Sequence, residues 1–151
     1  MGAAESNPIR NMDKRTARRE YAEDFKRGIQ QYRALQKYKE NLSGDANANE
    51  LPDDPNVWED GDLKVFVRKR PIFKREIDLG EFDVVTCFND RNIVIHDARM
   101  HTDMKKQFLN HHKFQFDHVF NDRADNLSVY SVTTAPLVKI ASEGGYATCF
   151  V

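Results

Sequence analysis

The densest group of reactive side chains in the sequence is the basic run Arg68-Lys69-Arg70-Pro71, which follows alternating apolar residues at 63–67. Proline cannot donate to a strand ladder, so Pro71 predicts the end of a strand. On its own the run is typical of a solvent-exposed strand end, where basic residues and strand-breaking prolines are common. Any chemical role for these residues therefore depends on the elements around them.

The histidines and cysteines show no metal or nucleophile motif. Four histidines are candidates for metal ligands: His96, His101, His111 and His112. Their spacing matches no standard zinc site and no cysteine pair lies near them, so we interpret them as edge-loop residues and expect no metal. Cys87 and Cys149 lack the spacing of a disulfide framework, and we expect both to be small buried strand residues in a reducing compartment.

The sequence contains no phosphate-binding loop. Such a loop needs the pattern G-x-x-x-x-G-K-[ST], because its glycines let backbone N–H groups surround phosphates while its lysine neutralises their charge. None of the seven glycines precedes a lysine in that pattern. Gly2 and Ser6 fit the loose M-G-x-x-x-[ST] myristoylation pattern, a minor alternative because such short matches are often accidental.

Charge is segregated along the 151 residues. The chain has 23 Lys+Arg and 24 Asp+Glu, so its net charge of −1 gives no overall attraction to nucleic acid or membrane. Residues 10–39 contain ten basic and four acidic residues, whereas residues 41–62 contain seven acidic and no basic residues. No apolar run is long enough to span a membrane. We predict a disordered N-terminus over 1–12, a basic neck helix over 13–43, an acidic linker over 44–62 and a folded α/β part over 63–151.

Apolar residues three or four positions apart predict the basic helix. They are Tyr21, Phe25, Ile29, Tyr32, Leu35, Tyr38 and Leu42. Gly28 weakens the middle of this helix, and Gly44 favours a stop.

Beyond the linker the apolar period changes to that of strands. We predict a strand at 63–67, a hairpin of 84–88 with 92–96, and a strand at 113–120 with one aromatic face. A helix over 126–142 and a strand over 146–151 complete a βαβ unit with that strand. Seven side chains are expected in one core: Val65, Val67, Phe114, Phe116, Phe120, Ile140 and Phe150.

Four segments, in the right order and spacing, resemble a kinesin motor domain. Leu63–Pro71 resembles its opening strand, and Phe114–Phe120 resembles its central strand motif. Val129–Val138 resembles its first major helix, and Gly144–Val151 resembles the strand that delivers the phosphate-binding loop. The resemblance covers about residues 63–151 and implies an α/β fold. That fold is the N-terminal part of a kinesin-type P-loop NTPase sheet with a small edge hairpin, which looks cut just before the phosphate-binding loop.

Other features resemble the internal-motor, microtubule-depolymerising kinesin-13 class. Asp24–Leu35 resembles the neck helix of that class, and Lys69 between two arginines fits it better than transport kinesins. Segment 97–110 takes the place of the extended loop whose tip is Lys-Val-Asp in that class, and the tip here reads His101-Thr102-Asp103. The acid is retained, but histidine is mostly neutral at pH 7, so the change from lysine bears on the strength of depolymerisation.

The resemblance implies roles for individual residues. Arg68, Arg70 and Pro71 would line the adenine side of an ATP site, where a planar arginine can stack and donate hydrogen bonds. ATP and Mg would bind the complete motor, whereas this chain alone is expected to hold neither and to be inactive. Microtubule-binding residues are expected in the tip and the neck: His101, Thr102, Asp103, Lys105, Lys106, Lys14, Arg15, Arg18, Arg19, Lys26 and Arg27. For residues 10–19, a solvated helix face paired with the acidic linker is an equal alternative, while Phe25–Leu35 is expected to pack on the motor.

The implied parent function is microtubule-stimulated ATP hydrolysis that destabilises microtubule ends. Tubulin would be the partner, a homodimer could form through regions outside the chain, and the location would be the cytoplasmic cytoskeleton, at spindle or axoneme. The alternative is a non-catalytic microtubule-binding or scaffold protein derived from a motor. A nucleic-acid- or membrane-associated basic-helix protein is disfavoured by the match from Leu63 onward.

Overall fold

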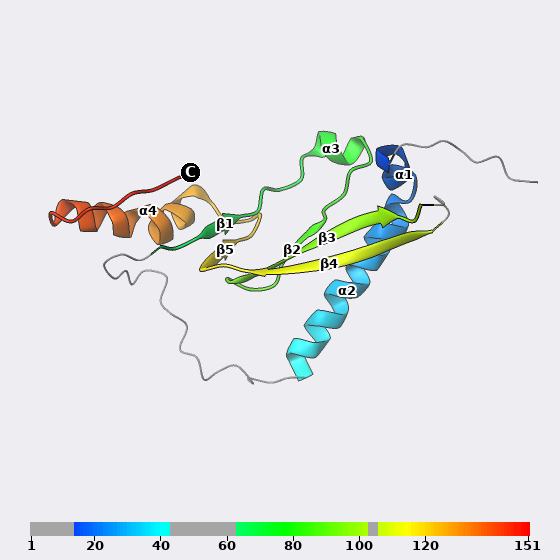
Figure 1. Cartoon of the computed structure of the whole chain (residues 1–151), viewed down its shortest axis with the longest axis horizontal. Coiled ribbons are helices and arrows are strands. Elements are labelled where there is room, and N and C mark those ends of the chain that lie inside the picture. Colours follow the sequence, from blue (N-terminus) through cyan, green and yellow to red (C-terminus); the bar gives the residue numbers. More distant parts are fainter. Residues whose placement is uncertain (1–13, 43–62, 103–105) are drawn as a thin grey trace, which may run out of the picture.

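The computed structural model describes residues 14–42, 63–102 and 106–151 (Figure 1). The segments predicted to be a disordered N-terminus and an acidic linker lie outside the described residues. Asp103 and Lys105 of the predicted tip lie outside them as well. In the described part, α1 and α2 lie at one end and α4 at the other, with the strands between them.

Within this part, five strands form two small sheets. Their bounds are β1 Phe66–Arg68, β2 Val85–Cys87, β3 Asn92–Met100, β4 Gln107–Gln115 and β5 His118–Phe120. β1 and β5 pair in parallel, whereas β2, β3 and β4 form an antiparallel sheet in that order. The predicted hairpin is confirmed, with Val85 opposite Ile95. In its turn the side-chain oxygen of Asn89 accepts the backbone N–H groups of Arg91 and Asn92.

The helices are α1 Lys14–Glu20, α2 Ala22–Leu42, α3 Lys74–Asp78 and α4 Asn126–Ser142. The predicted neck helix is therefore present as two helices that are interrupted at Tyr21. The predicted helix over 126–142 is confirmed: the side chain of Asp125 caps its start by accepting the N–H of Ser128. Gly144 follows its end with a φ of +91°, a conformation that glycine adopts readily. Over the described ranges, no helix combines the length and the apolar character needed to cross a membrane.

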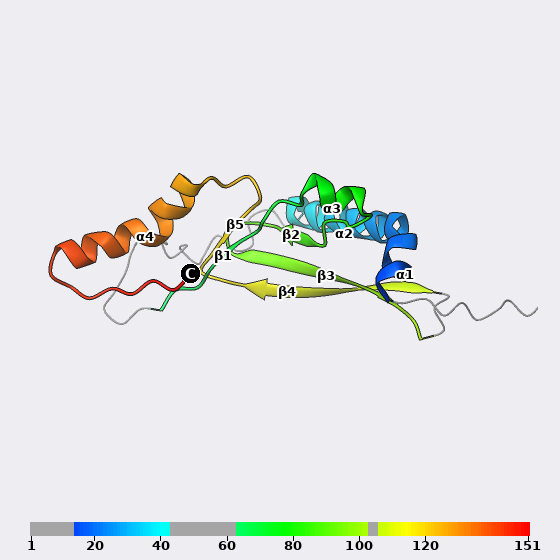
Figure 2. The ribbon, with the colours of Figure 1, turned by 90° about the horizontal axis from the view of Figure 1, so that it is seen from above.

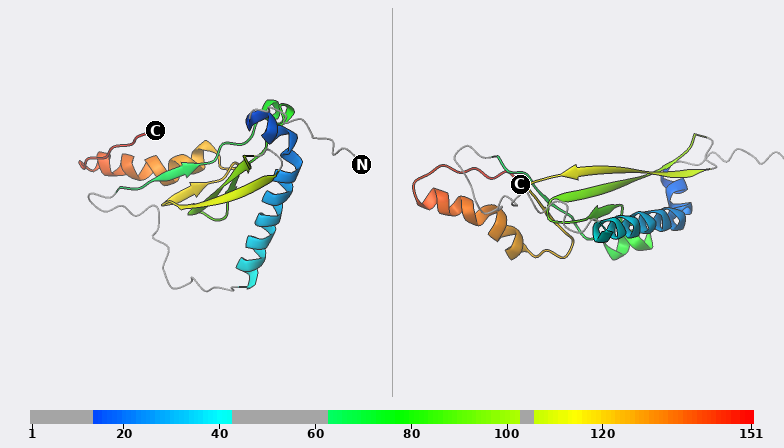
Figure 3. Two further views of the ribbon diagram at one scale, coloured as in Figure 1. Left: turned by 45° about the vertical axis from the view of Figure 1, so that its right-hand side comes forward. Right: turned by 90° about the horizontal axis from the view of Figure 1, so that it is seen from below.

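Helix α2 packs across the antiparallel sheet, as the views in Figures 2 and 3 show. The buried cluster that joins them consists of Ala22, Phe25, Ile29, Phe82 and Ala98. The rings of Phe25 and Phe82 stack with their centroids 5.9 Å apart. The second half of α2 extends beyond the sheet, which leaves Leu35 59% and Tyr38 61% exposed. Only the first half of the predicted apolar face is therefore buried.

The single strand predicted over 113–120 is wrong, because the chain changes sheets within it. β4 ends at Gln115 and β5 begins at His118. Between them Asp117 bonds to Val65 twice: its side chain accepts the N–H of Val65 at 2.7 Å, and its own N–H donates to the Val65 carbonyl at 3.2 Å. The parallel partner of β5 is thus β1, and residues 146–151 form no strand in the described part. The predicted βαβ unit is absent there.

The predicted core is also largely wrong. Among its seven side chains only Phe120 is buried, while Val65 is 48%, Phe114 44% and Phe150 92% exposed. Cys149 is exposed rather than buried, and Cys87 is half-buried in β2. For Val65 and Phe150 the physical reason is that, in the described part of the chain, the two-stranded β1–β5 sheet leaves a groove beside α4, which both side chains line. The core lies under the neck helix instead.

Candidate functional site

Arg68, the last residue of β1, reaches across to the start of α4. Its terminal nitrogens donate to the side-chain oxygen of Asn126 and to the carbonyl of Ala124, both at 2.8 Å. Hydrogen bonds from Ser128 hold the pKa of the neighbouring Asp125 below its ordinary value, and the Arg68 charge adds to this effect. The guanidinium is therefore fixed at the N-terminal end of α4 while remaining solvent-exposed.

Arg70 turns to α3 instead. Its guanidinium pairs with both carboxylate oxygens of Glu76, at 2.7 and 3.0 Å, and lies 4.4 Å from the ring centre of Phe73. The hydrogen bond from Arg70, followed by that from the Phe73 N–H, lowers the pKa of Glu76. Pro71 is exposed, and its carbonyl accepts from Arg70 at 3.2 Å. The predicted adenine-edge residues thus share one short stretch, but the two arginines contact different elements.

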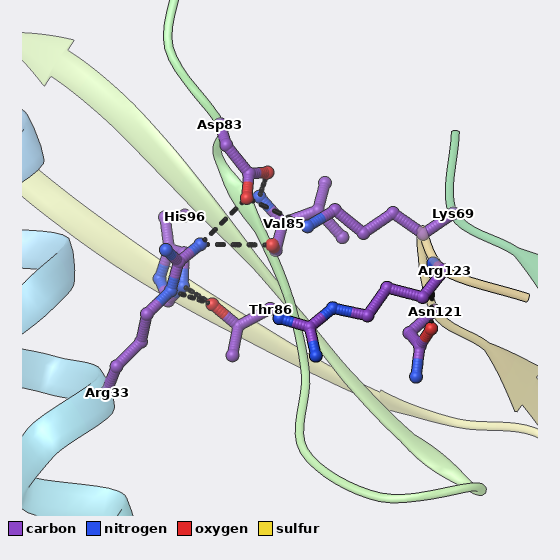
Figure 4. Close-up of polar contacts among 8 residues, drawn as sticks. All are labelled: Arg33, Lys69, Asp83, Val85, Thr86, His96, Asn121 and Arg123. Atoms are coloured by element: carbon purple, nitrogen blue, oxygen red, sulfur yellow. Dashed lines mark hydrogen bonds and ion pairs between the residues drawn. The ribbon is translucent and has the colours of Figure 1, made fainter. Parts of the chain in front are cut away.

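Lys69, between these arginines, points to the antiparallel sheet and meets Asp83 (Figure 4). The Lys69 ammonium lies 2.8 Å from Asp83 Oδ2, and its side chain is 12% exposed. Arg33 of α2 donates to the same oxygen at 3.2 Å. Burial alone would raise the pKa of Asp83, but the bonds from Lys69 and the Val85 N–H, with the charges of Lys69 and Arg33, leave that pKa lowered.

A second cluster lies between α2 and the sheet, around two histidines. Thr86 Oγ1 lies 2.8 Å from His96 Nε2, and His96 Nδ1 lies 2.8 Å from His111 Nδ1. The ring of Tyr32 stacks on His111 with centroids 3.9 Å apart. His96 is 1% exposed, and burial, followed by the charges of His111 and Arg33, lowers its pKa to about 4. The interpretation of His96 and His111 as edge-loop residues is therefore wrong, because both lie in strands under the neck.

The hairpin of β3 and β4 ends at the predicted tip. Each strand has nine residues, and the last ladder pair joins Met100 to Gln107. Beyond it the N–H of His101 donates to the carbonyl of Lys106 at 2.8 Å. The His101 ring packs against Phe108, with centroids 4.7 Å apart. His101, Thr102 and Lys106 are exposed at this end of the hairpin.

The basic residues of the neck have partners within the chain. Glu81, which follows α3, accepts from Arg19 at 2.9 Å and from Arg15 at 3.4 Å. Arg18 donates to the carbonyl of Ala98 on β3 at 3.3 Å. In α2, Lys26 pairs with Glu23, and Arg27 lies 3.8 Å from Asp24. Glu81 is thus a partner of Arg15 and Arg19 within the chain, whereas the acidic linker proposed for that role lies outside the described residues.

Sequence reasoning missed the residues that join neck, hairpin and β1. These are Arg33, Asp83, Thr86 and the His96–His111 pair. No motif marks them, because their partners are 10 to 53 positions away in the sequence. One weak signal exists: Tyr32 belongs to the predicted apolar helix face, so its neighbour Arg33 had to lie at the edge of that interface. Among the described residues, no three His, Cys, Asp or Glu side chains gather as metal ligands.

Comparison with known proteins identifies the fold to which these elements belong. The model of the kinesin motor domain matches residues 68–151, more than half of the chain. The chain belongs to the kinesin motor domain family. It is 36% identical over 96 residues to kinesin-like protein KIF24 of Homo sapiens, and likewise to that of Mus musculus. The aligned part is 63% of this chain but 7% of each relative, so the chain spans a small fraction of their length. The predicted α/β kinesin fold class is confirmed.

The residues present fit one part of the nucleotide that this family implies. Two guanidinium groups and a proline ring suit the flat, hydrogen-bonding edge of a base. The sequence offers no glycine-rich cradle for phosphates, and Glu76 already occupies both terminal nitrogens of Arg70. The base-binding roles of Arg68, Arg70 and Pro71 therefore stay predictions, and the terminal nitrogens of both arginines already donate to acceptors within the chain.

Proposed function

We propose that this chain is the neck and the N-terminal part of the motor domain of an ATP-driven kinesin-13 that destabilises microtubule ends. The observation that carries this proposal is the long β3–β4 hairpin, whose exposed end begins at His101 and which Arg18 of α1 contacts at Ala98, close to that end. A hairpin supported in this way can present its tip to a partner without bending. In this scheme residues 13–43 are the neck, 44–62 the linker and 63–151 the motor part.

The tip would recognise tubulin, an acidic protein, through shape and charge. His101, Thr102 and Asp103 would contact tubulin in its curved form, and Lys105 and Lys106 would supply positive charge beside them. ATP, when bound with Mg in the complete motor, would supply the free energy that resets the complex. The part played by this chain is to hold the base of ATP and to orient the tip.

The neck has two tasks in this proposal. Arg15 and Arg19 hold α1 on Glu81, and Arg18 holds it on β3, through which it would support the hairpin. Arg27, with its side chain 71% exposed and 3.8 Å from Asp24, remains available to acidic tubulin. Lys26 and Lys14 are proposed to add to that positive surface.

The proposed location follows from the proposed partner. A protein that acts on microtubule ends would be found on the cytoskeleton of the cytoplasm, at the spindle or the axoneme. A homodimer, if present, would form through regions outside this chain.

The test is a microtubule-shortening assay on the full-length protein that contains this chain. Stabilised microtubules are observed with the protein and ATP, and with the protein and a non-hydrolysable ATP analogue. We expect shortening from the ends that requires ATP turnover for repeated rounds. Binding along the lattice without shortening would contradict the proposal.

One observation favours a second candidate, a non-catalytic microtubule-binding or scaffold protein. The bidentate Arg70–Glu76 pair occupies an arginine that the ATP site would use. The same assay separates the two candidates, because a scaffold would bind microtubules equally well with ATP, with the analogue or without nucleotide.

A further inference from the structure

We propose that Asp83 couples docking of the neck helix α2 to the adenine edge at the end of β1. Under this proposal, nucleotide binding and neck docking strengthen one another. The inference rests on the proposed function, because it takes Arg68 and Arg70 as the base-binding residues. Asp83 acts as a positioning residue: it touches neither nucleotide nor tubulin.

The geometry around Asp83 joins three segments through one carboxylate (Figure 4). Its Oδ2 accepts from Lys69 at 2.8 Å and from Arg33 at 3.2 Å. Its Oδ1 accepts the N–H of Val85 at 3.0 Å, which fixes the carboxylate on the first residue of β2. Lys69 and Arg33 both donate to Oδ2. A movement of either cation therefore shifts the carboxylate and changes the hydrogen bond that the other cation makes with it.

Lys69 connects this carboxylate to the nucleotide edge. It lies between Arg68 and Arg70 in the chain, and its N–H donates to the Phe120 carbonyl at 2.8 Å, extending the β1–β5 ladder. When the flanking arginines reorganise around a base, the backbone of Lys69 has to adjust with them. Its side chain is 12% exposed, so its pair with Asp83 is less screened by water than a surface ion pair.

Arg33 connects the carboxylate to the neck. Besides Asp83, it donates to the carbonyl of Val85 at 3.1 Å and to Thr86 Oγ1 at 2.6 Å. These contacts anchor α2 to β2, one helical turn beyond the buried Ile29. A guanidinium with two acceptors on β2 and a third, Asp83, two residues before that strand is sensitive to the position of each of them. A β2 strand held more firmly through Lys69 and Asp83 should therefore hold α2 more firmly.

Glu81 provides a matched control two residues away. Its carboxylate pairs with Arg15 and Arg19 of α1, and among the described residues it holds no cation of the 68–70 segment. Loss of either acid removes one charge and its contacts to the neck, which are two arginines of α1 for Glu81 and Arg33 of α2 for Asp83. Only the loss of Asp83 also removes the contact to Lys69, the residue between the two arginines of the adenine edge.

The experiment measures amide hydrogen exchange of α2 in the full-length protein, with and without a non-hydrolysable ATP analogue and Mg, in the absence of microtubules. We expect the analogue to slow exchange of α2 by about fivefold or more in the wild type, the lower range of allosteric coupling. In Asp83→Asn the analogue should still bind but should change α2 exchange by less than about twofold. Glu81→Gln should speed exchange of the neck and yet keep the wild-type response to the analogue.

Arg33→Gln tests the same path from the neck side, and it keeps the Lys69–Asp83 pair in place should Asp83→Asn not fold. It should also abolish the response, and by reciprocity it should weaken binding of the analogue by the factor lost from the exchange response. An unchanged response in Asp83→Asn or Arg33→Gln, or an equal loss in Glu81→Gln, would overturn the inference. If the wild-type protein binds the analogue but the exchange of α2 does not change, this inference is wrong while the proposed function is unaffected. No binding at all would contradict the proposed ATP-driven function as well.

Discussion

At the scale of single residues, the polar contacts beneath the neck depend on His96 being neutral. His96 contacts Thr86 through one ring nitrogen and His111 through the other, so a neutral ring can accept from one and donate to the other. Thr86 takes a hydrogen from Arg33 and is free to donate its own to His96. A second proton on the His96 ring would place a positive charge in this buried cluster, beside the Arg33 cation.

The first prediction follows from the lowered pKa of His96. At His96 the unfolded chain binds a proton near pH 6.5 and the folded chain near pH 4, so the contribution of this residue to stability should be lost as pH drops between these values. The full difference corresponds to about 3 kcal/mol. His96→Gln removes the titrating group and should flatten this part of the curve. The free energy of unfolding is measured by denaturant titration at several pH values, on a protein that contains the neck and the complete motor domain.

The control for that prediction is His112→Gln. His112 is exposed on β4, the strand that pairs with the strand of His96, and its substitution leaves the buried His96 in place, so the fall in stability should persist. A curve that keeps its slope in His96→Gln would contradict the role given to the buried histidine.

At the scale of elements, close approach of α2 to β4 depends on Gly28. A Cβ built at this position would lie 2.6 Å from Leu109 Cδ1. In the sequence Gly28 looked like a weak point of a helix, since glycine costs about 1 kcal/mol relative to alanine. In the structure it is a position at which helix and hairpin approach closely.

The second prediction concerns Gly28→Leu. Leucine is a good helix former, so an isolated neck helix would gain stability, but in the folded protein the new side chain collides with Leu109. We expect a loss of about 1–3 kcal/mol, the usual range for overpacking. The loss in the free energy of unfolding is measured by thermal or denaturant unfolding of a protein that contains the neck and the complete motor domain.

Two further variants make that result specific. Leu109→Ala combined with Gly28→Leu should recover part of the loss, because it removes the side chain that the leucine meets. Ala34→Leu on the exposed side of α2 should stay within about 0.5 kcal/mol of the wild type. Equal losses for Gly28→Leu and Ala34→Leu would mean that the helix does not approach the hairpin at Gly28.

Elements with local signals could be predicted from the sequence, and elements that depend on distant partners could not. Capping and periodicity predicted α4, and the short turn at 89–91 predicted the β2–β3 hairpin. Nothing local showed that the chain changes sheets at Asp117, because the cause is a pair of bonds to Val65, 52 positions away. The burial predicted for Phe150 needed a neighbouring layer that these residues do not supply. Similarly, Arg68 and Arg70 could be selected as site residues, but Asp83 could not.

At the scale of the whole molecule, the chain has a packed end and an open end. The neck and the antiparallel sheet share the buried cluster, whereas an apolar groove of about 650 Å³ lies between β1 and α4. Exposed apolar residues such as Leu63 and Phe150 line it. The chain spans 7% of the length of its matched relatives, and we expect the rest of a motor domain to cover this groove.

The third prediction concerns nucleotide affinity at this scale. Isothermal titration of the 151-residue chain with MgATP should show binding no tighter than about 1 mM, because phosphate contacts normally carry most of the affinity and this chain has no phosphate loop. A protein extended through the complete motor domain should bind far more tightly. Micromolar binding by the 151-residue chain would mean that the site lies elsewhere than Arg68, Arg70 and Pro71.

The most direct test of the proposed function changes the hairpin tip in the full-length protein. The variant carries His101→Ala, Thr102→Ala and Asp103→Ala, and the control carries Lys113→Ala and Gln115→Ala, exposed residues at the opposite end of β4. Both should keep the wild-type melting temperature, because neither set lies in the buried cluster. The tip variant should shorten stabilised microtubules about tenfold more slowly or worse, the effect of losing ~1.4 kcal/mol of recognition, while the control shortens them at the wild-type rate. A tip variant as fast as the wild type would show that this hairpin is not the element that acts on tubulin.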